Sequence, residues 1–244
     1  MLAYARSGGT LLNRCIAKMP NIIMLSEVNV EALCPSSCNT IKEQAMKWYH
    51  INLKTEGFIN NVKELYGYCE KNDKILVIRD WPFGSFVPSK YNNFNPSKRL
   101  STLISISKFF PVIPFALVRN SIDVWLSFQA SPRTFYDTKL TYLNEFIKCL
   151  IEKKIKIFRY EDFCKFPVKT MKLICKYTRM SYSSDFKKFS DYINVTGDTD
   201  LPEYSRGIKD GGIGELSRRK TYRDFVDEIN NNTLSKKINK LLRY

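Results

Sequence analysis

Short apolar runs recur along the chain and are separated by longer stretches of mixed polarity. Each run is too short for an ordinary helix and consists mostly of apolar residues, which is typical of a strand buried on both faces. The predicted strands are residues 2–5, 22–25, 75–78, 114–118 and 155–158. Because parallel neighbours need long crossover connections, this spacing favours a parallel sheet.

The connecting stretches show the period of amphipathic helices. In the segment 57–70, for example, Phe58, Val62, Leu65 and Cys69 recur at helical spacing. Helices are predicted over residues 11–18, 57–70, 142–153, 166–177 and 226–242. Alternating strands and helices predict an α/β fold, a doubly wound three-layer sandwich with a central parallel sheet of about five strands. We expect residues 1–244 to form a single domain.

The charge balance indicates an anionic ligand or partner. Lysine and arginine number 39 against 24 acidic residues, which gives a formal net charge of +15. Nucleic acid, an acidic membrane, a polyphosphorylated cofactor and an acidic acceptor all fit this charge. The basic residues are spread over the whole length, which argues against a disordered polycationic tail.

Cysteine usage and hydropathy bear on the compartment. The 7 cysteines include no paired C-x-x-C set and leave an odd count, as expected in a reducing environment. No stretch of about twenty apolar residues is present, and the first residues lack the pattern of a signal peptide. We therefore expect a cytoplasmic protein without an integral membrane segment, although an anchor upstream of residue 1 would be compatible with the sequence.

The strongest local signal for chemistry is a glycine-rich stretch between the first predicted strand and the first predicted helix. Residues 5–12 read Ala-Arg-Ser-Gly-Gly-Thr-Leu-Leu. A turn of this kind directs backbone N–H groups and the positive end of the helix dipole at an anion. It is not the nucleotide-kinase loop G-x-x-x-x-G-K-[ST], because no lysine precedes Thr10. A plain glycine-rich turn without a ligand remains the alternative.

This stretch resembles P-R-S-G-T-T-L-L, the phosphosulfate-binding loop of sulfotransferases, most closely in the tyrosylprotein and carbohydrate branches. Ala5 stands in place of the proline, and Gly9 in place of the first threonine. The resemblance implies a P-loop NTPase-like fold that uses 3′-phosphoadenosine-5′-phosphosulfate (PAPS) as donor, releases 3′-phosphoadenosine-5′-phosphate (PAP) and requires no metal. The donor-binding residues that it implies here are Arg6, Ser7, Gly8, Gly9 and Thr10.

A second element follows the fourth predicted strand. Residues 119–127 resemble the R-N-P-x-D-x-x-x-S element that binds the 3′-phosphate in this family, with Ser121 in place of the proline. Arg119 and Ser127 keep the family's spacing. This spacing lets an arginine at a strand end and a serine two helical turns later reach one phosphate.

Two further motifs lie at the ends of other predicted strands. Residues 157–163 contain R-Y-E-D, and in the tyrosylprotein branch the tyrosine lines the nucleotide site, a role that the resemblance assigns to Tyr160. A core-edge aromatic is an equal alternative for this residue. Residues 79–83 resemble K-D-P-F, with Trp81 inserted and with Arg79 in place of the lysine that faces the sulfonate.

The late part of the chain resembles the family in two incompatible ways. Residues 214–217 resemble E-A-L-S, whose serine, here Ser217, reaches the donor in the tyrosylprotein branch. Arg206 and Gly207 instead resemble the R-K-G element of cytosolic sulfotransferases. Which residues of 206–217 contact the donor therefore stays open.

Sulfuryl transfer needs cations for the leaving nucleotide and a base for the acceptor hydroxyl. Arg6 and Arg79 are expected to stabilise the leaving oxygen and the sulfonate. Glu27 is the favoured general base, because a glutamate at this place serves as base in the tyrosylprotein branch. The lone His50 is the second candidate, and a structural pairing of Glu27 with an arginine is the alternative to catalysis.

The predicted activity is transfer of a sulfuryl group from PAPS to a hydroxyl of a peptide tyrosine, a carbohydrate, a lipid or a small molecule. An acidic acceptor would suit the positive charge. The rival enzyme class, a P-loop small-molecule kinase, needs a lysine and metal ligands that the sequence lacks. The rival binding class, a basic nucleic-acid-binding domain, is disfavoured because the aromatics fall in predicted core positions. The acceptor and the oligomeric state are not determined by the sequence.

Overall fold

The five apolar runs form one parallel sheet. In a computed structural model, which describes residues 1–31, 40–88, 95–129, 140–196, 212–214, 217–220, 226–227, 229 and 231–244, the strand order is β2-β3-β1-β4-β5. The strands are β1 (Leu2–Ala3), β2 (Ile22–Val28), β3 (Ile75–Asp80), β4 (Phe115–Val118) and β5 (Lys156–Arg159). The predicted strands and the predicted fold class are confirmed.

Helices join these strands, as the sequence predicts. The α-helices are α1 (Gly9–Ala17), α2 (Ile41–Tyr49), α3 (Phe58–Lys71), α4 (Phe83–Phe86), α5 (Ser101–Ile106), α6 (Ser121–Gln129), α7 (Leu140–Glu152), α8 (Tyr160–Lys165), α9 (Pro167–Thr178) and α11 (Thr233–Leu242). A 3₁₀ helix, η1, spans Ser184–Asp191. The prediction of one uninterrupted helix over 226–242 is wrong, because the described residues 226, 227, 229 and 231 are helical but the helix is interrupted at Asn232. Asn232 has an extended backbone and its side chain accepts from Ser235 N, so that it begins α11 instead of continuing a helix.

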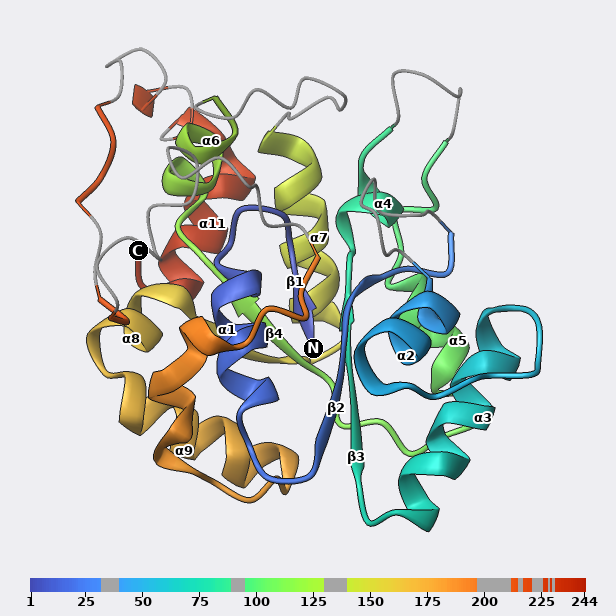
Figure 1. The fold of residues 1–244 in the computed structure, drawn as a ribbon. Coiled ribbons are helices and arrows are strands. Elements are labelled where there is room, and N and C mark those ends of the chain that lie inside the picture. Colours follow the sequence, from blue (N-terminus) through green and yellow to red (C-terminus); the bar gives the residue numbers. More distant parts are fainter. Residues whose placement is uncertain are drawn as a thin grey trace.

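The side chains of each strand alternate between two layers of helices. Ala3, Phe115 and Leu117 pack with α1, α8 and α9, whereas Leu2 and Ala116 pack with α4 and α7. At the other end of the sheet, β2 packs with α2 and α3. Figure 1 shows α1 and α9 to the left of β2 and β3, with α2 and α3 to their right. The molecule is thus a three-layer sandwich.

The position of β1 determines where a ligand can bind. It lies between β3 and β4, and the chain leaves it directly into α1. In such open sheets, ligands bind beyond the carboxyl ends of the strands, here the upper part of Figure 1. Within the described residues, no helix is long and apolar enough to cross a membrane.

Candidate functional site

The predicted site residues lie at the carboxyl ends of all five strands. Arg6 follows β1, Glu27 lies at the end of β2, and Arg79 lies at the end of β3. Arg119 directly follows β4, and Tyr160 directly follows β5. Because the strands are parallel, these ends share one edge of the sheet, so residues far apart in the sequence are brought together there.

The glycine-rich stretch forms a tight turn that opens α1. Arg6 has a φ of 68° and Gly8 a φ of 85°, and Ser7 N donates to Tyr4 O at 3.1 Å. Gly8 is the N-cap of α1 and has no side chain to cap it, and the first turn carries no acidic residue. The first N–H groups of such a helix have no intrahelical acceptor. The turn therefore has the geometry of an anion cradle.

Gly8 also makes room for an aromatic ring. A Cβ atom at this position would lie 2.3 Å from Cδ2 of Tyr160, which is far inside van der Waals contact. Tyr160 is buried, and burial raises the pKa of its hydroxyl, so that the side chain remains neutral. The ring therefore packs against the cradle.

Arg6, Arg119 and Ser127 form a cluster on the α6 side of the cradle. Arg6 Nε donates to Ser127 Oγ at 2.9 Å, and Arg119 Nη1 donates to Arg6 O at 3.4 Å. The guanidinium carbon of Arg119 lies 4.8 Å from the centroid of the Tyr160 ring. Two guanidinium groups and a hydroxyl thus meet beside the N-terminus of α1, a combination that suits a phosphate.

Arg79, Glu27 and Thr10 form a second cluster on the β2 side of the cradle. Arg79 Nη2 lies 2.6 Å from Glu27 Oε1, and both side chains of this ion pair are buried. Arg79 Nη1 donates to Thr10 Oγ1 at 3.2 Å, in the first turn of α1. The pairing of Glu27 with an arginine, the alternative to catalysis, is therefore present in the structure. It does not by itself exclude a second role for the carboxylate.

Gly9 explains how an arginine fits at position 79. A Cβ atom at Gly9 would lie 3.0 Å from Arg79 Nε and Nη2, and 2.7 Å from Ala3 Cβ. The guanidinium group therefore occupies space that any side chain at position 9 would enter. Gly9 and Arg79, two positions at which the chain differs from the motifs that it resembles, lie in contact, and the first makes room for the second.

A buried network holds the backbone next to Glu27, and the sequence did not reveal it. Glu27 has a φ of 51°, and the register of β2 shifts between Leu25 and Val28. Ser26 N donates to Gln44 Oε1, and Gln44 Nε2 donates to Ser26 O, both at 2.7 Å. Thr196 Oγ1 also donates to Ser26 O at 2.9 Å. The sequence predicts no helix over residues 41–49, and the contact between Gln44 and Ser26 appears only in the tertiary structure.

A second unpredicted contact joins the cradle region to the last residue. Glu161 accepts from Asn120 N at 2.9 Å and from the Tyr244 hydroxyl at 2.8 Å. Glu161 belongs to the R-Y-E-D motif, in which the resemblance implies a role only for Tyr160. The carboxylate fixes the start of α6 relative to β5, and thereby Arg119 relative to Tyr160.

Ser217 lies in the described part of the late segment, and its side chain is exposed. Its neighbour Arg218 forms a bidentate pair with Asp123 of α6, at 3.0 and 3.1 Å. Asp123 lies one helical turn before Ser127, so the pair places this segment beside α6. Arg206, Gly207, Glu215 and Leu216 lie outside the described residues.

His50 is not brought to the cradle. Along α2, Gln44 contacts Ser26 and the Tyr49 hydroxyl contacts the backbone of Met24, so the helix runs toward the amino end of β2. His50 follows as an exposed C-cap with a φ of 57°. The structure thus separates the second candidate base from Arg6 and Arg79.

Asp80 follows Arg79 and is buried at the end of β3. Burial raises its pKa to about 6, and the hydrogen bond that Asn29 Nδ2 donates to Oδ1 at 3.0 Å opposes this shift. Asn29 Nδ2 also donates to Trp81 O at 3.2 Å. The described residues contain no group of three or more His, Cys, Asp or Glu side chains arranged to hold a metal ion.

No protein-family model and no curated protein sequence matches the chain. Solved structures do match its fold. The sulfotransferase domain from the curacin biosynthetic pathway aligns with a TM-score of 0.57 and 11% identity, covering 100% of this chain and 96% of that one. The sulfotransferase domain of the olefin synthase from Synechococcus PCC 7002 aligns with a TM-score of 0.56 and 14% identity, covering 100% and 94%. The chain therefore has the fold of sulfotransferase domains.

Proposed function

We propose that this chain is a PAPS-dependent sulfotransferase that transfers a sulfuryl group to an acceptor hydroxyl and releases PAP. The observation that carries the proposal is that two clusters containing arginine side chains flank one helix N-terminus. The cluster of Arg6, Arg119 and Ser127 lies on one side, and the cluster of Arg79, Glu27 and Thr10 lies on the other. PAPS is a ligand with two separate anionic groups, so an anion site with two ends suits it.

The residues fit this donor in three respects. Gly8 and the uncapped first turn of α1 leave backbone N–H groups for the phosphosulfate. Arg119 and Ser127 would hold the 3′-phosphate, with Arg6 between the two ends. Tyr160 lines the cradle beneath Arg119, and Ser217 follows on the α6 side.

When bound, the donor would supply the sulfuryl group and a nucleotide leaving group. Arg79 and the amides of the first turn of α1 would stabilise the negative charge that develops as the sulfur–oxygen bond to the nucleotide breaks. These groups are held in place before the reaction, because Arg79 is buried and bound to both Thr10 and Glu27. The chain would need no metal for this, because a sulfuryl group carries less negative charge than a phosphoryl group.

Glu27 is our proposed general base. Its carboxylate would take the proton of the acceptor hydroxyl while the acceptor oxygen forms its bond to sulfur. A carboxylate can accept several hydrogen bonds at once, so its pairing with Arg79 is compatible with this role. The acceptor itself, whether peptide tyrosine, carbohydrate, lipid or small molecule, is left open.

Calorimetric binding of PAP and of AMP, which lacks the 3′-phosphate, tests the donor class. We expect PAP to bind at least roughly tenfold more tightly, because the 3′-phosphate gains charge-assisted contacts with Arg119 and Ser127. Arg119→Ala should abolish this preference, whereas the exposed Arg99→Ala should keep it. Transfer of labelled sulfate from PAPS to fractionated protein, glycan and lipid should then proceed in EDTA.

Equal affinity for PAP and AMP would contradict the proposal. Tight binding of ATP only with magnesium would indicate the kinase alternative. Binding of a short oligonucleotide in place of either nucleotide would indicate a nucleic-acid-binding domain.

A further inference from the structure

One side of α9 exposes large apolar side chains to solvent. Phe166, which precedes the helix, and Leu173 are each 49% exposed, and Tyr177 is 38% exposed. The opposite side of α9 packs into the core through Met171 and Ile174. One face of α9 therefore packs in the core, and the other face exposes apolar side chains to solvent.

Lysines share this exposed side with the apolar residues. Lys169, Lys172 and Lys176 are exposed and recur at helical spacing, so they lie on one face. No acidic residue occurs between positions 163 and 184. We call Phe166, Lys169, Lys172, Leu173 and Lys176 the α9 face.

Two lysine ammonium groups lie close to the Phe166 ring of this surface. Lys165 Nζ and Lys169 Nζ lie 5.4 and 6.0 Å from the centroid of the Phe166 ring. A shallow groove of about 560 Å³ follows the helix, and every residue lining it belongs to the stretch 166–176. The α9 face is thus a continuous surface in which cationic groups surround exposed apolar ones.

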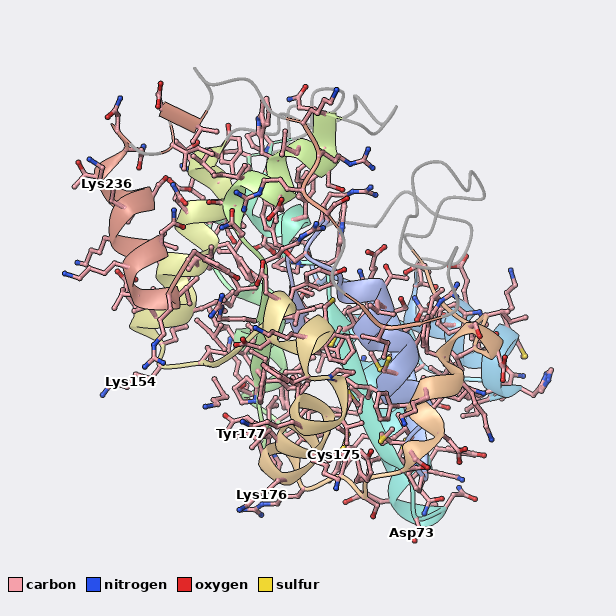
Figure 2. The ribbon with its side chains drawn as sticks, turned by 90° about the vertical axis from the view of Figure 1, so that its left-hand side faces the viewer. Asp73, Lys154, Cys175, Lys176, Tyr177 and Lys236 are labelled. Carbon is pink, nitrogen blue, oxygen red and sulfur yellow. The ribbon has the colours of Figure 1, made fainter. Side chains whose placement is uncertain are left out.

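The positive charge continues beyond the helix. The Tyr177 ring packs on Phe158 of β5 with centroids 6.3 Å apart, and Lys156 Nζ lies 5.7 Å from the Phe158 ring. Figure 2 views this side of the molecule, with Lys176 and Tyr177 labelled in its lower part and the cradle edge above. The α9 face therefore lies apart from the proposed donor site.

We propose that the α9 face docks on an anionic lipid surface. Lysine ammonium groups attract the phosphate and carboxylate groups of anionic headgroups, and their alkyl stems let them reach that level. Phe166 and Leu173 would enter the boundary between headgroups and acyl chains, as in interfacial amphipathic helices. A nucleic acid or an acidic peptide would also pair with the lysines, and the binding experiments below distinguish these occupants from a lipid surface.

Vesicle sedimentation of the full chain tests this proposal without any reference to enzyme activity. We expect vesicles that contain phosphatidylserine to bind the chain at least roughly tenfold more tightly than pure phosphatidylcholine vesicles. The triple variant Lys169→Glu/Lys172→Glu/Lys176→Glu should lose this gain. The triple variant Lys236→Glu/Lys237→Glu/Lys240→Glu, on the exposed face of α11, changes the net charge equally and should retain most of it.

The apolar contribution needs its own pair of variants. Phe166→Ser/Leu173→Ser should weaken binding several-fold at unchanged charge, whereas Ile193→Ser/Leu241→Ser, at two other exposed positions, should not. Thermal melting establishes that each variant is folded. Equal losses in the two lysine variants, no loss in Phe166→Ser/Leu173→Ser, or binding to an acidic polypeptide or oligonucleotide but not to vesicles would overturn the proposal.

Discussion

The guanidinium group of Arg79 contacts three parts of the site at once. It pairs with Glu27 of β2, donates to Thr10 of α1, and lies against the backbone at Gly9. A lysine at this position would offer a single flexible ammonium group, whereas the planar guanidinium group binds several partners in fixed directions. At the scale of the residue, these contacts of Arg79 are possible because Gly9 has no side chain.

Gly9→Ala should therefore destabilise the protein. The new methyl group would lie 2.7 Å from Ala3 Cβ and 3.0 Å from Arg79, so the chain must shift at a cost of about 1–3 kcal/mol in the free energy of unfolding. Urea unfolding measures this change. Gly67→Ala is the matched control, because a Cβ atom there meets nothing within 4 Å and Gly67 lies inside α3, so this variant should gain up to about 1 kcal/mol. Equal effects at the two glycines would contradict the close packing of Arg79.

Glu27→Gln should reduce kcat by roughly two orders of magnitude or more while PAP still binds normally. The amide keeps the shape of the side chain and can still accept from Arg79, but it cannot take a proton from the acceptor. Steady-state kinetics with PAPS and calorimetry with PAP separate the two effects. A loss of PAP affinity in parallel with kcat would instead support a purely structural ion pair. If Glu27→Gln stays active and His50→Ala does not, the base is His50.

At the scale of the element, the end of β2 is the part that needs outside support. Glu27 has a left-handed backbone conformation, which is unfavourable for a residue with a side chain. The side chain of Gln44, on α2, bonds the N–H and the C=O of Ser26 and so ties the strand end to the helix. Thr196 adds a hydrogen bond from the segment after η1. The helix thus contributes to the position of Glu27 without touching the cradle.

Gln44→Leu should lower both stability and turnover. The variant removes the acceptor of the buried Ser26 N–H and leaves Ser26 O with the hydrogen bond from Thr196, at a cost of about 1–3 kcal/mol in the free energy of unfolding. Because β2 would then relax at Glu27, kcat should fall more than PAP affinity does. Denaturant unfolding and kinetics provide the two readouts. Lys47→Leu, at an exposed position of the same helix, should change neither, and an equal loss there would contradict the role of Gln44.

At the scale of the whole molecule, the sheet edge joins parts of the chain that are distant in sequence. The hydroxyl group of Tyr244, the last residue, donates its single proton to Glu161 Oε2 at 2.8 Å, and its oxygen lies 3.2 Å from Val118 O. Asp80 lies buried in the same sheet, with its pKa raised to about 6 by burial. The protonation of the buried Asp80 carboxyl group therefore affects the free energy of unfolding of the whole chain.

Asp80→Asn should change how stability depends on pH. Between about pH 4 and pH 6 the folded chain keeps the Asp80 proton while the unfolded chain has lost it, so the stability of the parent falls as the pH rises through this window. The asparagine side chain does not titrate in this window. The free energy of unfolding of the variant relative to that of the parent should therefore rise by about 2–3 kcal/mol from the lower to the upper end of the window. Urea unfolding at several pH values measures the difference. A difference that does not vary with pH would contradict the raised pKa.

The sequence alone determined the fold and the chemical character of the edge. Apolar runs and helical periods are local patterns, so all five strands and the sandwich were predictable. The glycine-rich turn was also predictable, because glycines between a strand and a helix allow the left-handed backbone conformation that a tight turn needs. The motifs after the strands placed Arg6, Arg79, Arg119 and Tyr160 at one edge, since parallel strands end on the same side. Their roles in binding and catalysis remain predictions.

The tertiary structure decided which of these residues touch and which do not. Arg79 meets Thr10 across 69 positions, and Thr196 meets Ser26 across 170 positions, and no local pattern encodes such pairs. The sequence leaves His50 as a candidate base, but α2 runs toward the amino end of β2, and His50 at its end therefore lies away from the cradle. The link between Gly9 and Arg79 likewise appears only when β3 packs against the start of α1. Secondary-structure propensities are local properties of the sequence, whereas these contacts form only when the helices and strands pack together.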